Sequence, residues 1–292
     1  MKRLLTLTAL SLLAHATAAI PARFSLEVGQ SVNLTTLGTS KTATFVSSDP
    51  SIIQVNGRTA TALRLTPDGQ AVTITATEGR TVTQAAVTSH GIEYGVGAGT
   101  TLRSGQPPAN ARILIVRARM VNGAAPDRID SAYAYGNAQL NPAKLAPLTG
   151  LVKIGGMLIG QFSLDQGQEP WDLLMRSGNI TRRFQVPAQS LRDVGPTSSI
   201  QGTVRGNTLT LTGSAPAESS LAVRVTGNAR LMSLPPISQP GRTRLPATVT
   251  LNVPGGQKAS VEVRIYNAPV LDPSRALPST FTWTQHTVAT VR

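Results

Sequence analysis

Apolar and polar residues alternate along most of this chain. Val72, Ile74 and Ala76 alternate with threonines, and the same period recurs at Val249–Val253 and Val261–Ile265. A period of two gives a strand one apolar face for a core and one polar face for water. The many valines and threonines favour strands as well. The pattern therefore predicts an all-β protein.

Turn-forming residues separate the predicted strands, for example Asn56-Gly57 and Pro254-Gly255-Gly256. Short strands divided by glycine and proline turns are typical of sandwiches and barrels. We predict tandem β-sandwich domains joined by a glycine- and proline-rich linker. Few helices are expected, and the less regular segments Trp171–Arg176 and Val186–Asp193 are the candidates for short ones.

Changes in composition divide the chain into blocks. Residues 91–110 are rich in glycine and proline, which predicts a linker. The chain is predicted to contain a signal peptide at 1–19, an Ig-like β-sandwich at 20–90, the linker at 91–110, a second β-rich domain at 111–195 and a third β-sandwich at 196–292.

The stretch FVSSDPSIIQV, residues 45–55, reads as two strands around a polar turn. Proline fixes φ, and the side chains of Asp49 and the serines can bind the local backbone, so the turn is a hairpin corner. We interpret it as scaffold, because a turn former at such a corner needs no catalytic role.

The block at residues 20–90 contains a set of residues with a recognisable spacing: Val28, Gly29, Leu34, Phe45, Ser47, Ser48, Pro50, Ser51, Val55, Thr61, Ala62, Gly69, Val72, Ile74, Ala76 and Thr77. Through these residues the block resembles the bacterial Ig-like group 2 family. Phe45 stands where the family usually has tryptophan. The resemblance implies an Ig-like sandwich displayed at a cell surface, without an active site. The same block is also similar to the small N-terminal domain of pilus-assembly secretins, through Asp49, Pro50, Ser51 and Ile52.

The N-terminal segment has the layout of a secretory signal peptide. A basic start, Lys2 and Arg3, precedes an apolar run that is too short to span a bilayer, and cleavage is expected after Ala16, Ala18 or Ala19. The chain contains no cysteine, so a disulfide framework is excluded and a packed core must supply its stability. We expect a secreted protein of the periplasm or cell surface of a bacterium.

The formal net charge is +13. Such an excess favours attraction to polyanions, including anionic envelope polymers. The candidate binding residues are the most closely spaced arginines: Arg112, Arg117, Arg119, Arg182 and Arg183. Aromatic residues make up only 4% of the chain, which argues against a dedicated nucleic-acid surface.

An acidic loop supplies the alternative site. Asp165, Glu169 and Asp172 lie beside Trp171, and paired carboxylates near an aromatic ring are typical of glycosidases. A polar loop anchored by the tryptophan explains the same residues. We predict no metal and no cofactor, because the histidines that remain after signal cleavage are far apart and no cysteine is present.

The sequence thus predicts a non-enzymatic envelope protein that binds or spaces. Its partner would be an anionic envelope polymer or another envelope protein. Two alternatives stay open: an accessory subunit of a pilus, secretion or surface-layer assembly, and a secreted hydrolase using the Asp165–Asp172 loop. An exposed strand edge would serve the first of these, because such edges recruit strands.

Overall fold

The computed structural model describes residues 19–102, 106–164, 170–187, 198–205, 208–216, 218–227, 230–231, 245–252 and 259–291. The all-β prediction is confirmed. Strands dominate these ranges, which contain two short 3₁₀ helices, Leu34–Leu37 and Pro142–Lys144. No helix in them is long and apolar enough to cross a membrane.

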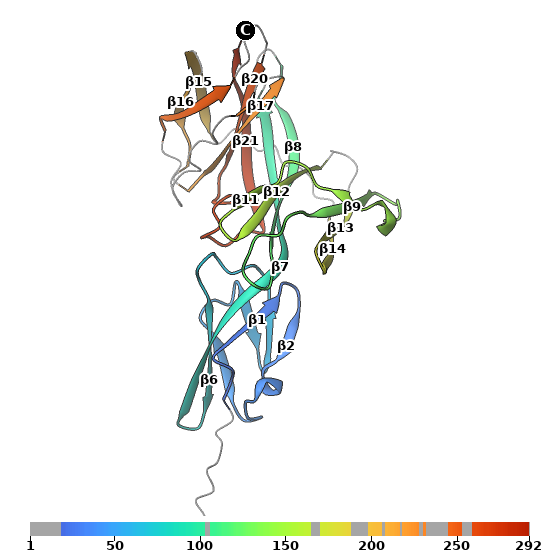
Figure 1. The fold of residues 1–292 in the computed structure, drawn as a ribbon, viewed down its shortest axis with the longest axis vertical. Coiled ribbons are helices and arrows are strands. Elements are labelled where there is room, and N and C mark those ends of the chain that lie inside the picture. The colour runs from blue at the N-terminus through green and yellow to red at the C-terminus, as the bar shows by residue number, and fades with distance from the viewer. Residues whose placement is uncertain are drawn as a thin grey trace, which may run out of the picture.

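The strands follow one another in three groups along the chain (Figure 1). The first comprises β1 (Arg23–Glu27), β2 (Ser31–Asn33), β3 (Thr44–Ser47), β4 (Ile53–Asn56), β5 (Thr59–Ala62), β6 (Val72–Glu78) and β7 (Thr81–Leu102). The second comprises β8 (Ala109–Arg119), β9 (Asp130–Tyr135), β10 (Ala146–Pro147), β11 (Val152–Ile154), β12 (Met157–Leu164), β13 (Trp171–Ser177) and β14 (Ile180–Val186). The third comprises β15 (Ser199–Arg205), β16 (Thr208–Ser214), β17 (Ser220–Gly227), β18 (Arg230–Leu231), β19 (Ala247–Asn252), β20 (Ala259–Tyr266) and β21 (Thr280–Val291).

Strand β7 is shared between the first group and the rest of the molecule. Its first half pairs with β6 and, in parallel, with β1. Its second half pairs with β8 and, in parallel, with β21. The resulting sheet has the order β11-β12-β8-β7-β21-β20-β17. Figure 1 shows β7 running from the blue N-terminal strands into the green and red ones.

Smaller sheets pack against this large sheet. The sheet β2-β5-β4 closes a sandwich around Leu34, Ile53, Ile74 and Val87, which are buried together. The sheet β10-β9-β13-β14 encloses a second apolar cluster with Leu114 and neighbouring residues of β8. Strands β15 and β16 cover a third cluster with β17 and β20. Sandwich packing thus recurs along the chain.

The predicted linker at residues 91–110 is wrong, since β7 continues to Leu102 and β8 begins at Ala109. The glycines have a packing role. Gly95, Gly97 and Gly99 occupy alternate positions, so they share one face of β7. A Cβ added to Gly97 would lie 2.3 Å from the ring of Phe281, and one added to Gly99 would lie 2.6 Å from the ring of Trp283. The glycines let two aromatic rings lie directly on the strand.

The segment of residues 45–55 also differs from its prediction. Both strands and the turn are present, but β3 pairs with β6 whereas β4 pairs with β5, so the turn joins two sheets and is not a hairpin. The Asp49 carboxylate accepts hydrogen bonds from the backbone N–H of Ser51 at 3.0 Å and from its hydroxyl at 2.6 Å. This is the scaffold role expected for the turn.

The helix predicted at Trp171–Arg176 is wrong, because this segment is strand β13. Trp171, Leu173 and Met175 are buried at alternate positions, and this period of two belongs to a strand. The second candidate helix, Val186–Asp193, begins at the last residue of β14 and otherwise lies mostly outside the described residues.

Candidate functional site

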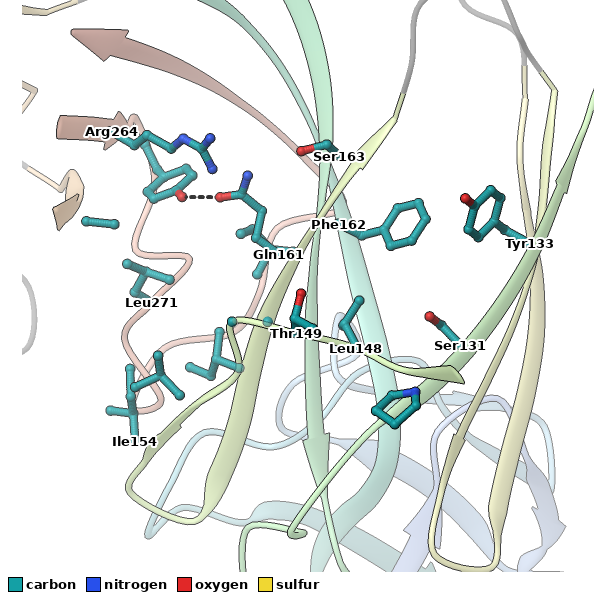
Figure 2. A pocket seen from close by; sticks show the side chains of 18 of the residues that line it. Ser131, Tyr133, Leu148, Thr149, Ile154, Gln161, Phe162, Ser163, Arg264 and Leu271 are labelled. Carbon is teal, nitrogen blue, oxygen red and sulfur yellow. Dashed lines mark hydrogen bonds between the residues drawn. The ribbon is translucent and has the colours of Figure 1, made fainter. Parts of the chain in front are cut away.

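A groove of about 1160 Å³ lies beside β12. Its walls come from β9 and the segment after it, from β12, and from β17, β20 and the loop that follows β20. Figure 2 shows Tyr133 and Ser131 on one side of β12, and Arg264 and Leu271 on the other. Residues far apart in the sequence therefore meet at this groove.

The groove follows a sheet edge. Strand β12 pairs with β8 from Leu158 to Leu164, but β11 covers its other side only from Met157 to Ile159. Within the described ranges, no strand pairs with that side from Gly160 to Leu164. A strand edge without a partner presents backbone N–H and C=O groups that can bind another strand.

The side chains of β12 point alternately to the two sides of the groove. Gln161 lies toward β20, and its Oε1 accepts a hydrogen bond of 2.7 Å from the Tyr266 hydroxyl (Figure 2). Phe162 lies toward β9, where its ring meets that of Tyr133 edge-on at 5.3 Å. Tyr133 is 53% exposed, so this aromatic pair forms an accessible wall.

Apolar residues line much of the rest. Ile115 and Ile159 come from β8 and β12, and Leu221 and Val223 come from β17. Leu271 comes from the loop between β20 and β21, and its backbone N–H donates to the Ser220 hydroxyl at 3.2 Å. The groove therefore combines apolar walls with polar side chains such as Gln161, Ser163 and Arg264, a mixture that can fix the orientation of a bound peptide or ligand.

Cationic groups lie at this groove. Arg264 is half-buried, its Nε donates to Oε1 of Gln285 at 2.5 Å, and its guanidinium lies 5.7 Å from the centre of the Trp283 ring. Lys144 is exposed at the rim, on the second 3₁₀ helix. Burial raises the pKa of Tyr266, so its hydroxyl stays protonated and can donate to Gln161.

The predicted arginine surface does not form, because Arg112, Arg117 and Arg119 are buried on β8. Arg117 is 0% exposed and donates to the backbone carbonyls of the β20–β21 loop. Those acceptors are the carbonyls of Pro269 at 2.9 Å, Val270 at 2.8 Å, Asp272 at 3.0 Å and Arg275 at 2.7 Å. This arginine therefore holds the loop that supplies Leu271 to the groove.

Glu93 on β7 is the buried acidic partner of Arg117. Its Oε2 accepts from the backbone N–H of Leu65 at 2.9 Å, and its Oε1 lies 3.9 Å from a nitrogen of Arg117. Burial raises the pKa of Glu93, and the positive charge of Arg117 opposes that shift. Buried charges are tolerated only with such partners.

Arg119 bridges to the loop that precedes β6. It donates to the carbonyl of Thr66 at 2.7 Å and pairs with Asp68, whose other carboxylate oxygen accepts from Gly156 N–H at 2.7 Å. Gly91 of β7 is the pairing partner of Arg119 and has φ +114°, a conformation that side chains with a Cβ rarely adopt. We call Glu93, Arg117, Arg119 and Asp68 the junction network.

The remaining predicted arginines differ from one another. Arg182 is half-buried, donates to the carbonyl of Ile92, and lies 6.0 Å from the centre of the Tyr94 ring. Arg183 is exposed and binds both carboxylate oxygens of Asp172. The five arginines therefore do not share a face, and only Arg183 among them is openly exposed.

The acidic loop is only partly described. Asp165 and Glu169 lie outside the described residues. Asp172 lies on β13, and its hydrogen bonds to Arg183 hold the pKa of this carboxyl below its usual range. It therefore stays ionised and is unsuited to act as a general acid. Among the described residues, no three His, Asp or Glu side chains are placed to bind a metal ion.

Sequence reasoning missed the groove and the junction network. The alternation Tyr133-Ala134-Tyr135 and the alternating glycines at 95, 97 and 99 were available signals, because both show the period of a strand. Nothing local signals Arg264 or Leu271 as groove residues. Only pairing between distant strands brings them to β12.

No known protein family matches the sequence, and no curated protein does. Among solved structures, the chain is similar to a marsupial T cell receptor at 12% sequence identity, over 80% of this chain and 78% of that one. The TM-score of that match is 0.18, so the likeness carries no argument about fold or function.

Proposed function

We propose that this chain is a non-enzymatic protein of the bacterial cell envelope that acts as a rigid spacer and binding module. The signal-like segment at residues 1–19 supports export to the periplasm or cell surface. The resemblance of the first block to bacterial Ig-like group 2 domains supports surface display, and the absence of cysteine means that rigidity must come from packing.

The observation that carries the spacer role is the continuity of β7. One strand of 22 residues serves both the N-terminal sandwich and the large sheet. The junction network then ties the loop before β6 and the β20–β21 loop to β8 through buried hydrogen bonds. A flexible tether would have few buried contacts and exposed polar groups at this point.

The test is a distance measurement between paired spin labels. Because the chain has no cysteine, Val46→Cys and Thr208→Cys give two unique labelling sites, one on β3 and one on β16. We expect a single narrow distance distribution, broadened by Arg117→Met and unchanged by Arg183→Met. A broad distribution in the otherwise unaltered chain would contradict the rigid spacer.

A second candidate is the accessory subunit of a pilus, secretion or surface-layer assembly. The uncovered edge of β12 favours it, since strand addition is a common means of assembly. The hydrolase alternative has less support, because Asp172 is engaged with Arg183 in an exposed ion pair. Because the five predicted arginines do not form one exposed face, binding to anionic envelope polymers would rely on the net charge of +13 and on scattered exposed arginines.

A further inference from the structure

Two strands at opposite margins of the large sheet line the same groove. The sheet path runs from β11 and β12 at one margin to β17 at the other. Gly160, Gln161 and Phe162 of β12 line the groove together with Leu221 and Val223 of β17. The two margins therefore curve toward one another, and the hydrogen bond from Tyr266 to Gln161 joins β20 to β12 across this curve.

Within the described ranges, β17 and the part of β12 beyond Ile159 each lack a strand on the outer side. In the ranges that the structure describes, β17 pairs only with β20, and β12 beyond Ile159 pairs only with β8. The unpaired backbone groups of such edges gain hydrogen bonds when an extended segment joins them. The pairing with β11 ends at Ile159, and at Gly160 the side chain of Leu151 packs so closely that a Cβ there would lie 2.3 Å from its Cδ2.

The walls suit alternating side chains. A strand joined to β12 would turn one set of its residues toward Ile115, Ile159 and Leu271, and the other set toward Phe162 and Tyr133. Both surfaces offer apolar side chains beside their polar ones, so apolar residues of an incoming strand would be buried on each side. The groove thus offers backbone pairing and apolar pockets together.

The charges at the groove favour an acidic occupant. Arg264 lies in the groove wall, and no carboxylate pairs with it among the described residues. Lys144 lies at the rim and is exposed. Half-burial in an apolar wall strengthens the attraction of Arg264 for a carboxylate. A second copy of this chain, with a net charge of +13, is less complementary.

We propose that the groove binds an extended, acidic segment of a partner protein, which adds as a strand to the free edge of β12 and lies along β17. Backbone hydrogen bonds give the affinity, the apolar walls select alternating apolar residues, and Arg264 selects an acidic one. This inference rests on the proposed function in one respect, that the chain acts by binding. It does not require the spacer role.

The test begins with selection of random nine-residue peptides on the mature chain, followed by hydrogen exchange of the complex. We expect enriched peptides that alternate apolar residues with aspartate or glutamate. The amides of β12 from Gln161 to Leu164 and of β17 should exchange more slowly in the complex. Failure to enrich a binder, or binders that leave both edges unprotected, would overturn the proposal.

Matched variants and peptides then separate the contributions. Arg264→Gln should lower the affinity for the selected peptide at least about tenfold. Lys144→Gln should lower it less, and Arg183→Gln should leave it unchanged. Circular dichroism checks that each variant is folded, and N-methylation of alternate peptide residues should abolish binding without any change to the protein. Equal affinity for the N-methylated peptide would rule out strand addition. If the amides of β12 and β17 were protected only because the protein self-associates, the occupant of the groove would be a second copy of the chain and not a partner protein. The spin-label distances test the spacer role separately, so either part of the function can fail alone.

Discussion

The ring of Phe281 on β21 lies over Gly97 of β7, so closely that a Cβ at position 97 would be 2.3 Å from Cε2 of the ring. The two residues are direct partners in the parallel pairing of β21 with β7. This contact joins the last strand of the chain to the strand that leaves the N-terminal sandwich. The glycine is therefore part of how the segments of the molecule are held together.

Gly97→Ala should lower the free energy of unfolding by about 1–3 kcal/mol, because the added methyl group overpacks the site against Phe281 and Ile113. The measurement is the urea unfolding midpoint. In a Phe281→Ala background the same substitution should cost clearly less, since the ring is gone. Ala98→Ser, on the opposite face of β7, serves as the control. Equal costs in both backgrounds would show that the contact does not decide the effect.

Arg117→Met should destabilise the protein by about 3–5 kcal/mol, since it leaves Glu93 without its buried counter-charge and several loop carbonyls without a donor. Arg117→Lys should recover only part of this loss, because one ammonium group cannot replace the planar fork of donors. Calorimetry and urea unfolding provide the measurement. The exposed Arg183→Met is the matched control, and a similar loss there would refute the special role of the junction network.

Acidification should destabilise the folded chain through its two described histidines. Burial lowers the pKa of His90, with Glu27 opposing the shift, and burial also lowers the pKa of His286, with Ser198 opposing it. The unfolded chain therefore binds more protons as the pH falls through about 6.5, and the free energy of unfolding declines there.

The measurement for this pH dependence is thermal unfolding between about pH 5 and pH 7.5, with and without His90→Gln and His286→Gln. The double variant should show a flatter dependence. Glu93 has the opposite sign, because burial raises the pKa of its carboxyl and the folded chain then binds more protons. A rise in stability on acidification over this range would show that Glu93 outweighs the histidines.

Retention on a sulfated polyanion resin should depend on exposed rather than buried arginines. A combined Arg58→Gln, Arg80→Gln and Arg183→Gln variant removes three charges from exposed positions and should elute at lower salt. The buried Arg112 and Arg119 should not contribute to this interaction. Unchanged elution of the triple variant would count against a surface-charge interaction.

The sequence predicted the all-β class and many strands because each strand carries its own apolar period. Val72–Glu78 and Ala259–Tyr266 show this plainly. It also predicted that Asp49 is a turn former, since such hydrogen bonds are local. It failed at residues 91–110 because alternating glycines look like a flexible tether until the rings they accommodate are known.

The candidate site was beyond sequence reasoning for a similar reason. A run of arginines on β8 looks like a charged surface, but the carbonyls that satisfy Arg117 lie on a loop more than a hundred residues later in the chain. That part of the β12 edge is unpaired follows only from the tertiary structure, in which the short β11 pairs with β12 no further than Ile159. What the sequence alone determined is the strand content and the local turns, which depend on neighbours. The tertiary structure decided which glycines receive rings, which charges are buried and which edge stays open, because each depends on contacts between residues that are distant in the chain.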